Sequence, residues 1–193
     1  APNTLQENGK TTSSFNARWE SVSGASSYRL DVSTNSSFSN ILSNYNNKTV
    51  SGTSHTVSGL TPGDRYYYRL RTRDGNACIS SNSSKITANT TLDTPSANSE
   101  SSKTTSSFKA NWSSVTGADE YLLYVSESSG FCSHLSGYNG KEITSTGHTI
   151  SNLDPGKAYY YRVKAKTNYY TTGYSNTNTA NTKLVPPNAT AET

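Results

Sequence analysis

The 193-residue chain has no methionine, only two cysteines and two tryptophans, and only three histidines. Its acidic residues number 13, and all charged residues together make 16% of the chain. No apolar run approaches the roughly 20 residues that span a bilayer, so we expect no membrane insertion. No secretory signal opens the chain and no initiator methionine is present, so we expect a segment of a longer product.

The scarcity of reactive side chains excludes the common catalytic signatures. The chain has no Gly-x-Ser-x-Gly, no His-Glu-x-x-His and no clustered pair of carboxylates. The stretch "NGKTT" at 8–12 is similar to a phosphate loop, but Thr4 stands where the first glycine of that loop is needed. We therefore expect no enzyme activity, no cofactor and no metal site.

Neutral polar residues make up much of what is present, because Ser, Thr and Asn together account for 81 of the 193 residues. Such a surface of hydroxyls and amides is typical of secreted bacterial modules, so we expect a secreted or cell-surface location. The net charge is only +4, and no nucleic-acid motif occurs. We therefore expect no nucleic-acid partner.

The sequence repeats itself at a shift of 93 residues. Pairs related by this shift include Phe15 and Phe108, Trp19 and Trp112, Tyr28 and Tyr121, His55 and His148, and Tyr66 and Tyr159. "TANT" at 87–90 returns at 179–182, and Pro2 corresponds to both Pro95 and Pro187. A period this long indicates whole domains. We predict a domain at 1–92, a second at 93–185, and at 186–193 a linker with the start of a further repeat.

Within each copy, apolar and polar residues alternate with period two. In "FNARW", "YRLDV" and "YYYRLR" the inward residues are expected to be Phe15, Ala17 and Trp19, then Tyr28, Leu30 and Val32, then Tyr66, Tyr68 and Leu70. Turn signals such as Pro-Gly-Asp separate these runs at short spacing. The pattern predicts an all-β antiparallel sandwich.

The motif Leu-x-Pro-Gly-x-x-Tyr, together with an earlier Trp and a Tyr-x-Leu-x-Val strand, resembles the fibronectin type III domain. The resemblance covers nearly the whole chain, twice, and is nearest to the version found in bacterial secreted and surface proteins. It implies two tandem immunoglobulin-like sandwiches of about seven strands each. It also implies that Tyr66 and Tyr159 form tyrosine corners beside buried Trp19 and Trp112. Arg73-Asp74-Gly75 reverses the cell-binding tripeptide of the animal module, so integrin recognition is not implied.

Two runs after the Pro-Gly turns place an aromatic residue and three cations on the outward face. They are Tyr67, Arg69, Arg71 and Arg73 in the first copy, and Tyr160, Arg162, Lys164 and Lys166 in the second. One interpretation is a surface for an anionic polysaccharide or another envelope polymer. The other is a solvated sheet face whose long cationic stems cover neighbouring tyrosines.

The loop that follows in the second copy, "TNYYTTGYSN", gathers Tyr169, Tyr170 and Tyr174 beside amides and hydroxyls. Exposed tyrosines with such neighbours are suited to stacking on sugars or contacting a protein. The alternative is that some of these rings pack on the adjacent domain. The first copy has "RDGNACISSN" there, so any such role belongs to the second domain alone.

The cysteines and histidines have structural interpretations. Cys78 and Cys132 are not equivalent in the repeat, and the regions that hold them lie at opposite poles of a module in the family's fold. We therefore favour free thiols over a fold-back or intermolecular disulfide. His55 and His148 recur in separate domains, which indicates a shared structural place. No zinc-type spacing surrounds them or His134.

Two functions from different classes remain open for a chain that we expect to be monomeric. The first is a non-catalytic spacer that positions the flanking domains of the same polypeptide. The alternative is a binding module for an extracellular polysaccharide or a surface protein. For the alternative, we expect Arg69, Arg71, Arg162 and Lys164 to supply charge and Tyr169, Tyr170 and Tyr174 to supply stacking.

Overall fold

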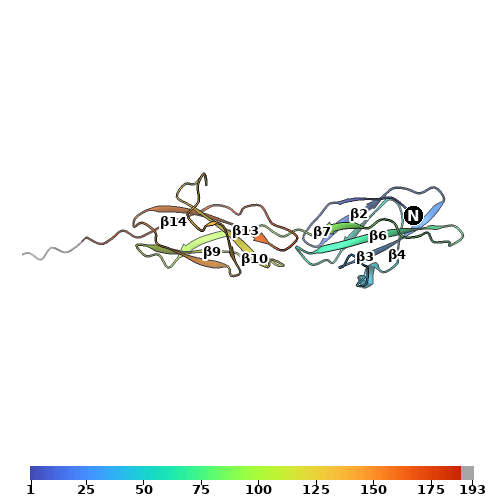
Figure 1. Cartoon of the computed structure of the whole chain (residues 1–193), viewed down its shortest axis with the longest axis horizontal. Coiled ribbons are helices and arrows are strands. Elements are labelled where there is room, and N and C mark those ends of the chain that lie inside the picture. The colour runs from blue at the N-terminus through green and yellow to red at the C-terminus, as the bar shows by residue number, and fades with distance from the viewer. Residues whose placement is uncertain (188–193) are drawn as a thin grey trace, which may run out of the picture. The chain divides into compact units, whose positions relative to one another are not determined.

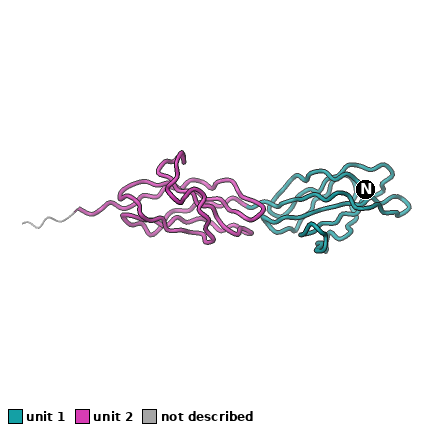
Figure 2. Tube along the Cα trace, viewed as in Figure 1, with its two compact units in different colours: residues 1–92 teal, residues 93–193 magenta. Residues whose placement is uncertain are grey.

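The structure is a computed structural model that describes residues 1–187. The chain divides into two compact units, Ala1–Leu92 and Asp93–Thr193, which Figure 2 colours separately. The further repeat expected from Pro187 onward falls mostly on residues 188–193, which lie outside the described part.

Unit 1 consists of two antiparallel sheets (Figure 1). The first has the order β1-β2-β5 and contains Thr4–Asn8, Ser14–Trp19 and Ser54–Ser58. The second has the order β4-β3-β6-β7 and contains Lys48–Val50, Ala25–Ser33, Arg65–Asp74 and Ile86–Asn89. A short 3-10 turn, η1 (Ser43–Tyr45), leads into β4.

Unit 2 repeats this topology. One sheet has the order β12-β9-β8, made of Gly147–Ser151, Ser107–Trp112 and Ala97–Ser101. The other has the order β11-β10-β13-β14, made of Asn139–Ile143, Glu120–Ser126, Ala158–Lys166 and Asn178–Asn181. Each unit is therefore a seven-stranded sandwich of the immunoglobulin type over the described residues.

The cores follow the period-two pattern because alternate side chains of each strand face the opposite sheet. Trp19 is 1% exposed, and Phe15, Tyr68 and Leu70 are fully buried. The Phe15 ring stacks on Tyr68 at 5.9 Å, and the equivalent rings of unit 2 stack at 6.0 Å. The two units thus share one aromatic core arrangement.

Both units contain the tyrosine corner. The Tyr66 hydroxyl accepts a hydrogen bond from the Thr61 amide at 2.9 Å, and the Tyr159 hydroxyl accepts one from the Asp154 amide at 3.0 Å. The repeated "TANT" closes the same turn, because the Thr90 hydroxyl donates to the Thr61 carbonyl and accepts from the Asp64 amide. These bonds satisfy backbone N–H and C=O groups in a turn where no neighbouring strand supplies hydrogen-bond partners.

Replacing Tyr66 with phenylalanine should lower the free energy of unfolding of unit 1 by about 1 kcal/mol, because it leaves the Thr61 amide without its acceptor while the ring still packs. Chemical denaturation followed by circular dichroism measures the change. Tyr67→Phe is the matched control, since the neighbouring Tyr67 points to the outer face, and it should leave the midpoint unchanged. Equal losses for the two variants would contradict the assignment.

The two repeated histidines occupy the same place in each sandwich. His55 lies against Tyr45 at 6.2 Å between ring centroids, and His148 lies against Tyr138 at 6.0 Å. Burial lowers the pKa of His55, and the nearby Lys48 lowers it further. The pKa of His148 is lowered by burial and by Lys141 in the same way. Both histidines therefore serve as packing residues beside a tyrosine.

Candidate functional site

The cation-bearing faces of β6 and β13 are the outer faces of the two four-stranded sheets. In β13 every second residue from Tyr159 to Ala165 is buried, so Arg162 and Lys164 point away from the core. In β6 the same alternation turns Arg69 and Arg71 outward. The structure therefore brings each pair of cations together on one face. The side chains that contact these cations differ between the two units.

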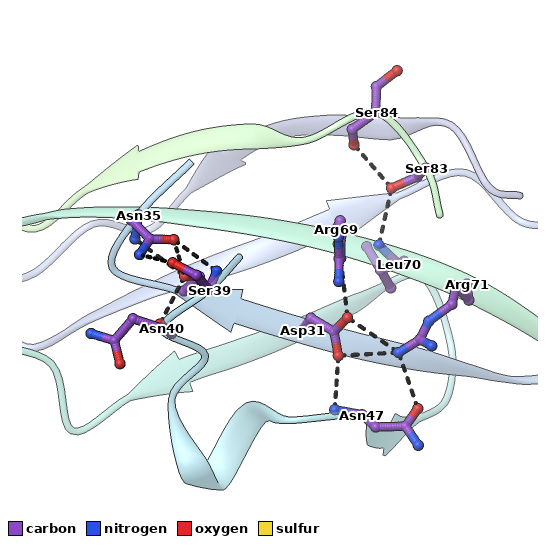
Figure 3. A network of polar contacts seen from close by, with 11 residues as sticks. Asp31, Asn35, Ser39, Asn40, Asn47, Arg69, Leu70, Arg71, Ser83 and Ser84 are labelled. Carbon is purple, nitrogen blue, oxygen red and sulfur yellow. Dashed lines mark hydrogen bonds and ion pairs between the residues drawn. The ribbon is translucent and has the colours of Figure 1, made fainter. Parts of the chain in front are cut away.

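In unit 1 the two arginines form ion pairs with one carboxylate from the neighbouring strand β3 (Figure 3). Asp31 pairs directly across from Arg69 in the sheet register and is only 1% exposed. Its Oδ2 accepts from Arg69 Nε at 3.1 Å, and the Arg71 guanidinium donates to both of its oxygens at 3.1 and 3.2 Å. The two arginines thus share one buried counter-charge.

Asn47 completes this arrangement. Its backbone adopts a positive φ of 55°, and its amide N–H donates to Asp31 Oδ1 at 2.8 Å. Its side-chain oxygen accepts from Arg71 at 3.2 Å, as Figure 3 shows. Arg69 also stacks on the Phe38 ring, with its guanidinium carbon 4.1 Å from the ring centroid. In unit 1 Arg69 and Arg71 therefore belong to an internal network with Asp31 and Asn47.

Unit 2 has different residues at two key positions of this network. Tyr124 takes the place of Asp31 and pairs with Arg162 in the sheet register. Gly140 takes the place of Asn47 and also has a positive φ, of 83°. A Cβ at Gly140 would lie 3.2 Å from the Tyr124 hydroxyl oxygen, so glycine makes room for the larger ring. The carboxylate and its supporting amide side chain are both missing.

The Arg162 guanidinium is held by aromatic rings. Its central carbon lies 4.0 Å from the Phe131 ring centroid and 3.6 Å from that of Tyr174, so the guanidinium contacts both rings. Lys164 contacts the same Tyr174 ring, with Nζ 4.0 Å from the centroid. Tyr124 meets Tyr174 edge to face at 5.0 Å. We call Arg162, Lys164, Tyr174, Tyr124 and Phe131 the β13 patch.

The cations of the β13 patch have no counter-charge in the part of the chain that the structure describes. The ion pairs of unit 2 engage Lys103, Lys157 and Lys166, and Lys166 at the end of the stripe contacts both Glu120 and Glu142. Arg162 Nε is buried without a hydrogen-bond partner among the described residues. Burial and the adjacent Tyr174 raise the pKa of Tyr124, so its hydroxyl stays protonated at neutral pH.

Of the three tyrosines expected to stack, Tyr174 is the one that lies on the two cations. Its neighbour Ser175 bonds to Val163 of β13 through backbone and hydroxyl, which fixes Tyr174 beside that strand. Tyr169 and Tyr170 lie in the turn after β13, where the Thr167 hydroxyl accepts from both of their amides. Tyr174 and Tyr169 are both well exposed, at 41% and 42%.

Sequence reasoning missed several contributors to these faces, among them Asp31 and two phenylalanines. Asp31 is an acid in an alternating strand and looks like a solvated residue. Phe38 and Phe131 follow at equivalent places in the two copies, both with positive φ, and carry the rings beneath Arg69 and Arg162. The repeat alignment holds the missing signal, because it pairs Asp31 with Tyr124 and so separates a face with an internal carboxylate from a face without one.

Within 1–187 no group of three His, Cys, Asp or Glu side chains could hold a metal ion. Cys78 and Cys132 are both exposed free thiols. No helix in that range is long and apolar enough to cross a membrane. A hollow in unit 2, lined by Leu135, Ser136, Tyr138 and residues 150–153, contains no acid or base beyond the Tyr138 phenol.

Comparison with known proteins identifies the family to which this architecture belongs. The family model described as the fibronectin type III domain matches residues 1–88 and again 93–181. A two-domain fibronectin type III segment from chicken tenascin superposes with a TM-score of 0.64 at 20% identity, over 95% of this chain and 99% of that one, a likeness of fold. Chitinase A1 of Niallia circulans is 31% identical over an alignment of 133 residues that covers 61% of this chain and 17% of that protein. The chain therefore belongs to the fibronectin type III family, with one domain in each of its two units.

Proposed function

We propose that this chain is a non-catalytic accessory segment of a longer secreted or cell-surface protein, in which two modules space the neighbouring domains. Its similarity to a small part of a much longer chitinase supports a place inside a longer protein. The surface rich in hydroxyls and amides supports an extracellular location. The spacing role rests on how the two units are joined.

The joint between the units is the observation that carries the proposal. The Thr91 amide is anchored to the Thr11 carbonyl of unit 1, and the Ser96 carbonyl accepts from the Ser113 amide of unit 2. Only residues 92–95 connect these anchors, and they include Pro95, whose φ is fixed. An extended chain gains at most about 3.6 Å per residue, so these four residues span at most about 14 Å. A short joint between two folded units is suited to a spacer.

The test exchanges the segment within the longer protein that contains it. Replacing residues 1–185 with two unrelated β-sandwich modules of equal length should keep the activity of the flanking domains, whereas deleting the segment should lower it. The isolated chain should leave a panel of glycosidase, esterase and nuclease substrates unchanged. Full activity after deletion, or activity restored only by this sequence, would contradict a spacing role.

A further inference from the structure

We propose that the β13 patch of unit 2 binds the carboxylate groups of an acidic polysaccharide through Arg162 and Lys164, beside the exposed Tyr174, and that unit 1 has no equivalent site. This goes beyond the spacing role and does not depend on it. The argument rests on the difference between two faces that share one fold.

Unit 1 shows what this pair of cations binds. The side chains at positions 69 and 71, which correspond to Arg162 and Lys164, converge on a single carboxylate at 3.1 Å. A guanidinium presents its N–H donors in a planar fork that matches a carboxylate. In unit 2 the described residues supply no carboxylate at this place. Arg162 and Lys164 therefore have no anion among the described residues.

The contacts with the two rings leave the Arg162 charge available to an external anion. Two rings lie against its guanidinium, with centroids 4.0 and 3.6 Å from the central carbon. Nε is buried, and contact with a ring leaves the terminal N–H donors for hydrogen bonds. Because the plane is already fixed, less side-chain entropy is lost when a ligand binds. Cation–aromatic contact also holds the charge without neutralising it, as an ion pair would.

The surroundings of the β13 patch favour a sugar polymer over an acidic protein. Protein interfaces usually have an apolar centre that is fully buried on binding. Among the described residues, the large apolar side chains exposed on the loop beside the patch are aromatic, Tyr169 and Tyr174. The other exposed residues near Tyr174 are Thr171, Gly173, Asn176 and Thr177. A tyrosine ring with a hydroxyl tip, set among amides and hydroxyls, suits the apolar and polar faces of a pyranose.

Affinity electrophoresis of the full chain in gels that contain polygalacturonic acid tests the proposal, with its methyl ester as the neutral comparison. The wild-type chain should be retarded by the acid and not by the ester. Arg162→Met keeps most of the stem and should weaken retention about tenfold, because charge-assisted hydrogen bonds are lost. Arg162→Lys keeps the charge but not the fork, so it should also weaken retention.

Two further variants locate the effect. Lys103→Gln with Lys109→Gln removes two charges from the opposite side of unit 2 and should leave retention within about twofold of wild type. Tyr124→Asp with Gly140→Asn rebuilds the unit 1 network in unit 2, so an internal carboxylate should engage the cations and abolish retention. The thermal midpoint of each variant verifies its fold, and Arg162→Met tests the site even if the rebuilt network fails to fold.

Several results would overturn the proposal. One is no retention by the polyacid. Another is an equal loss in the Lys103/Lys109 control, which would mean that charge alone is responsible. Equal retention by dextran sulfate would remove the carboxylate preference, and equal retention by poly-glutamate would favour an acidic protein partner. None of these outcomes bears on the segment exchange that tests the spacing role, so the two proposals fail separately.

Discussion

Replacing Trp19 with alanine should lower the free energy of unfolding of unit 1 by about 3–5 kcal/mol, which is enough to unfold many single domains. Trp19 is 1% exposed, and its ring lies 5.4 Å from that of Tyr28, between the two sheets. Its indole N–H has no hydrogen-bond partner among the described residues, so the loss is one of packing and leaves no new unpaired group.

The chain contains its own reference for this experiment, because the only other tryptophan is Trp112 in unit 2. In Trp19→Ala the tryptophan fluorescence reports unit 2 alone, and it should keep its wild-type denaturation midpoint. Far-ultraviolet circular dichroism reports both units, and it should show an additional loss at lower denaturant. Trp112→Ala should give the reverse, and Trp19→Phe, which keeps a ring beside Tyr28, should cost less. A Trp19→Ala chain with a single wild-type transition would contradict the core assignment.

The strands and the cores could be predicted from the sequence because both depend on local pattern. Alternation in "FNARW" and "YYYRLR" placed Trp19 and Tyr68 inside, since successive side chains of a strand face opposite sides of the sheet. The corner at Tyr66 follows from a short motif whose residues are close along the chain. Such features need no knowledge of which strand lies beside which.

The chemistry of the outer faces could not be predicted in the same way, because it depends on neighbours across the sheet. Alternation turned Arg69, Arg71 and Asp31 outward, yet Asp31 is almost fully buried beneath the two arginines. Tyr174 reaches Arg162 only because the segment after β13 runs back along that strand. Cations that look alike in the two copies therefore have different partners. In unit 1 the partner is distant along the chain, because Asp31 is 38 residues away from Arg69.

The same contrast predicts that unit 1 is sensitive to the loss of Asp31. Replacing it with alanine should lower the free energy of unfolding by about 3 kcal/mol, because breaking a buried ion pair leaves its partners without a counter-charge. The side chains of Arg69 and Arg71 are each only 25% exposed, so water replaces the lost carboxylate poorly. The Asn47 amide loses its acceptor in the same change.

Chemical denaturation of four variants separates charge from hydrogen bonding at this position. Asp31→Asn keeps one oxygen that can accept from the Asn47 amide, so it should fall between wild type and Asp31→Ala. Tyr124→Phe, at the equivalent place in unit 2, removes no charge and should cost well under the Asp31→Ala value. Adding Arg71→Met to Asp31→Ala should recover part of the loss, because one of the two stranded cations is then gone. If the double variant is instead less stable than Asp31→Ala alone, the two arginines are not held by this carboxylate, and the contrast between a closed unit 1 face and an open β13 patch fails with it.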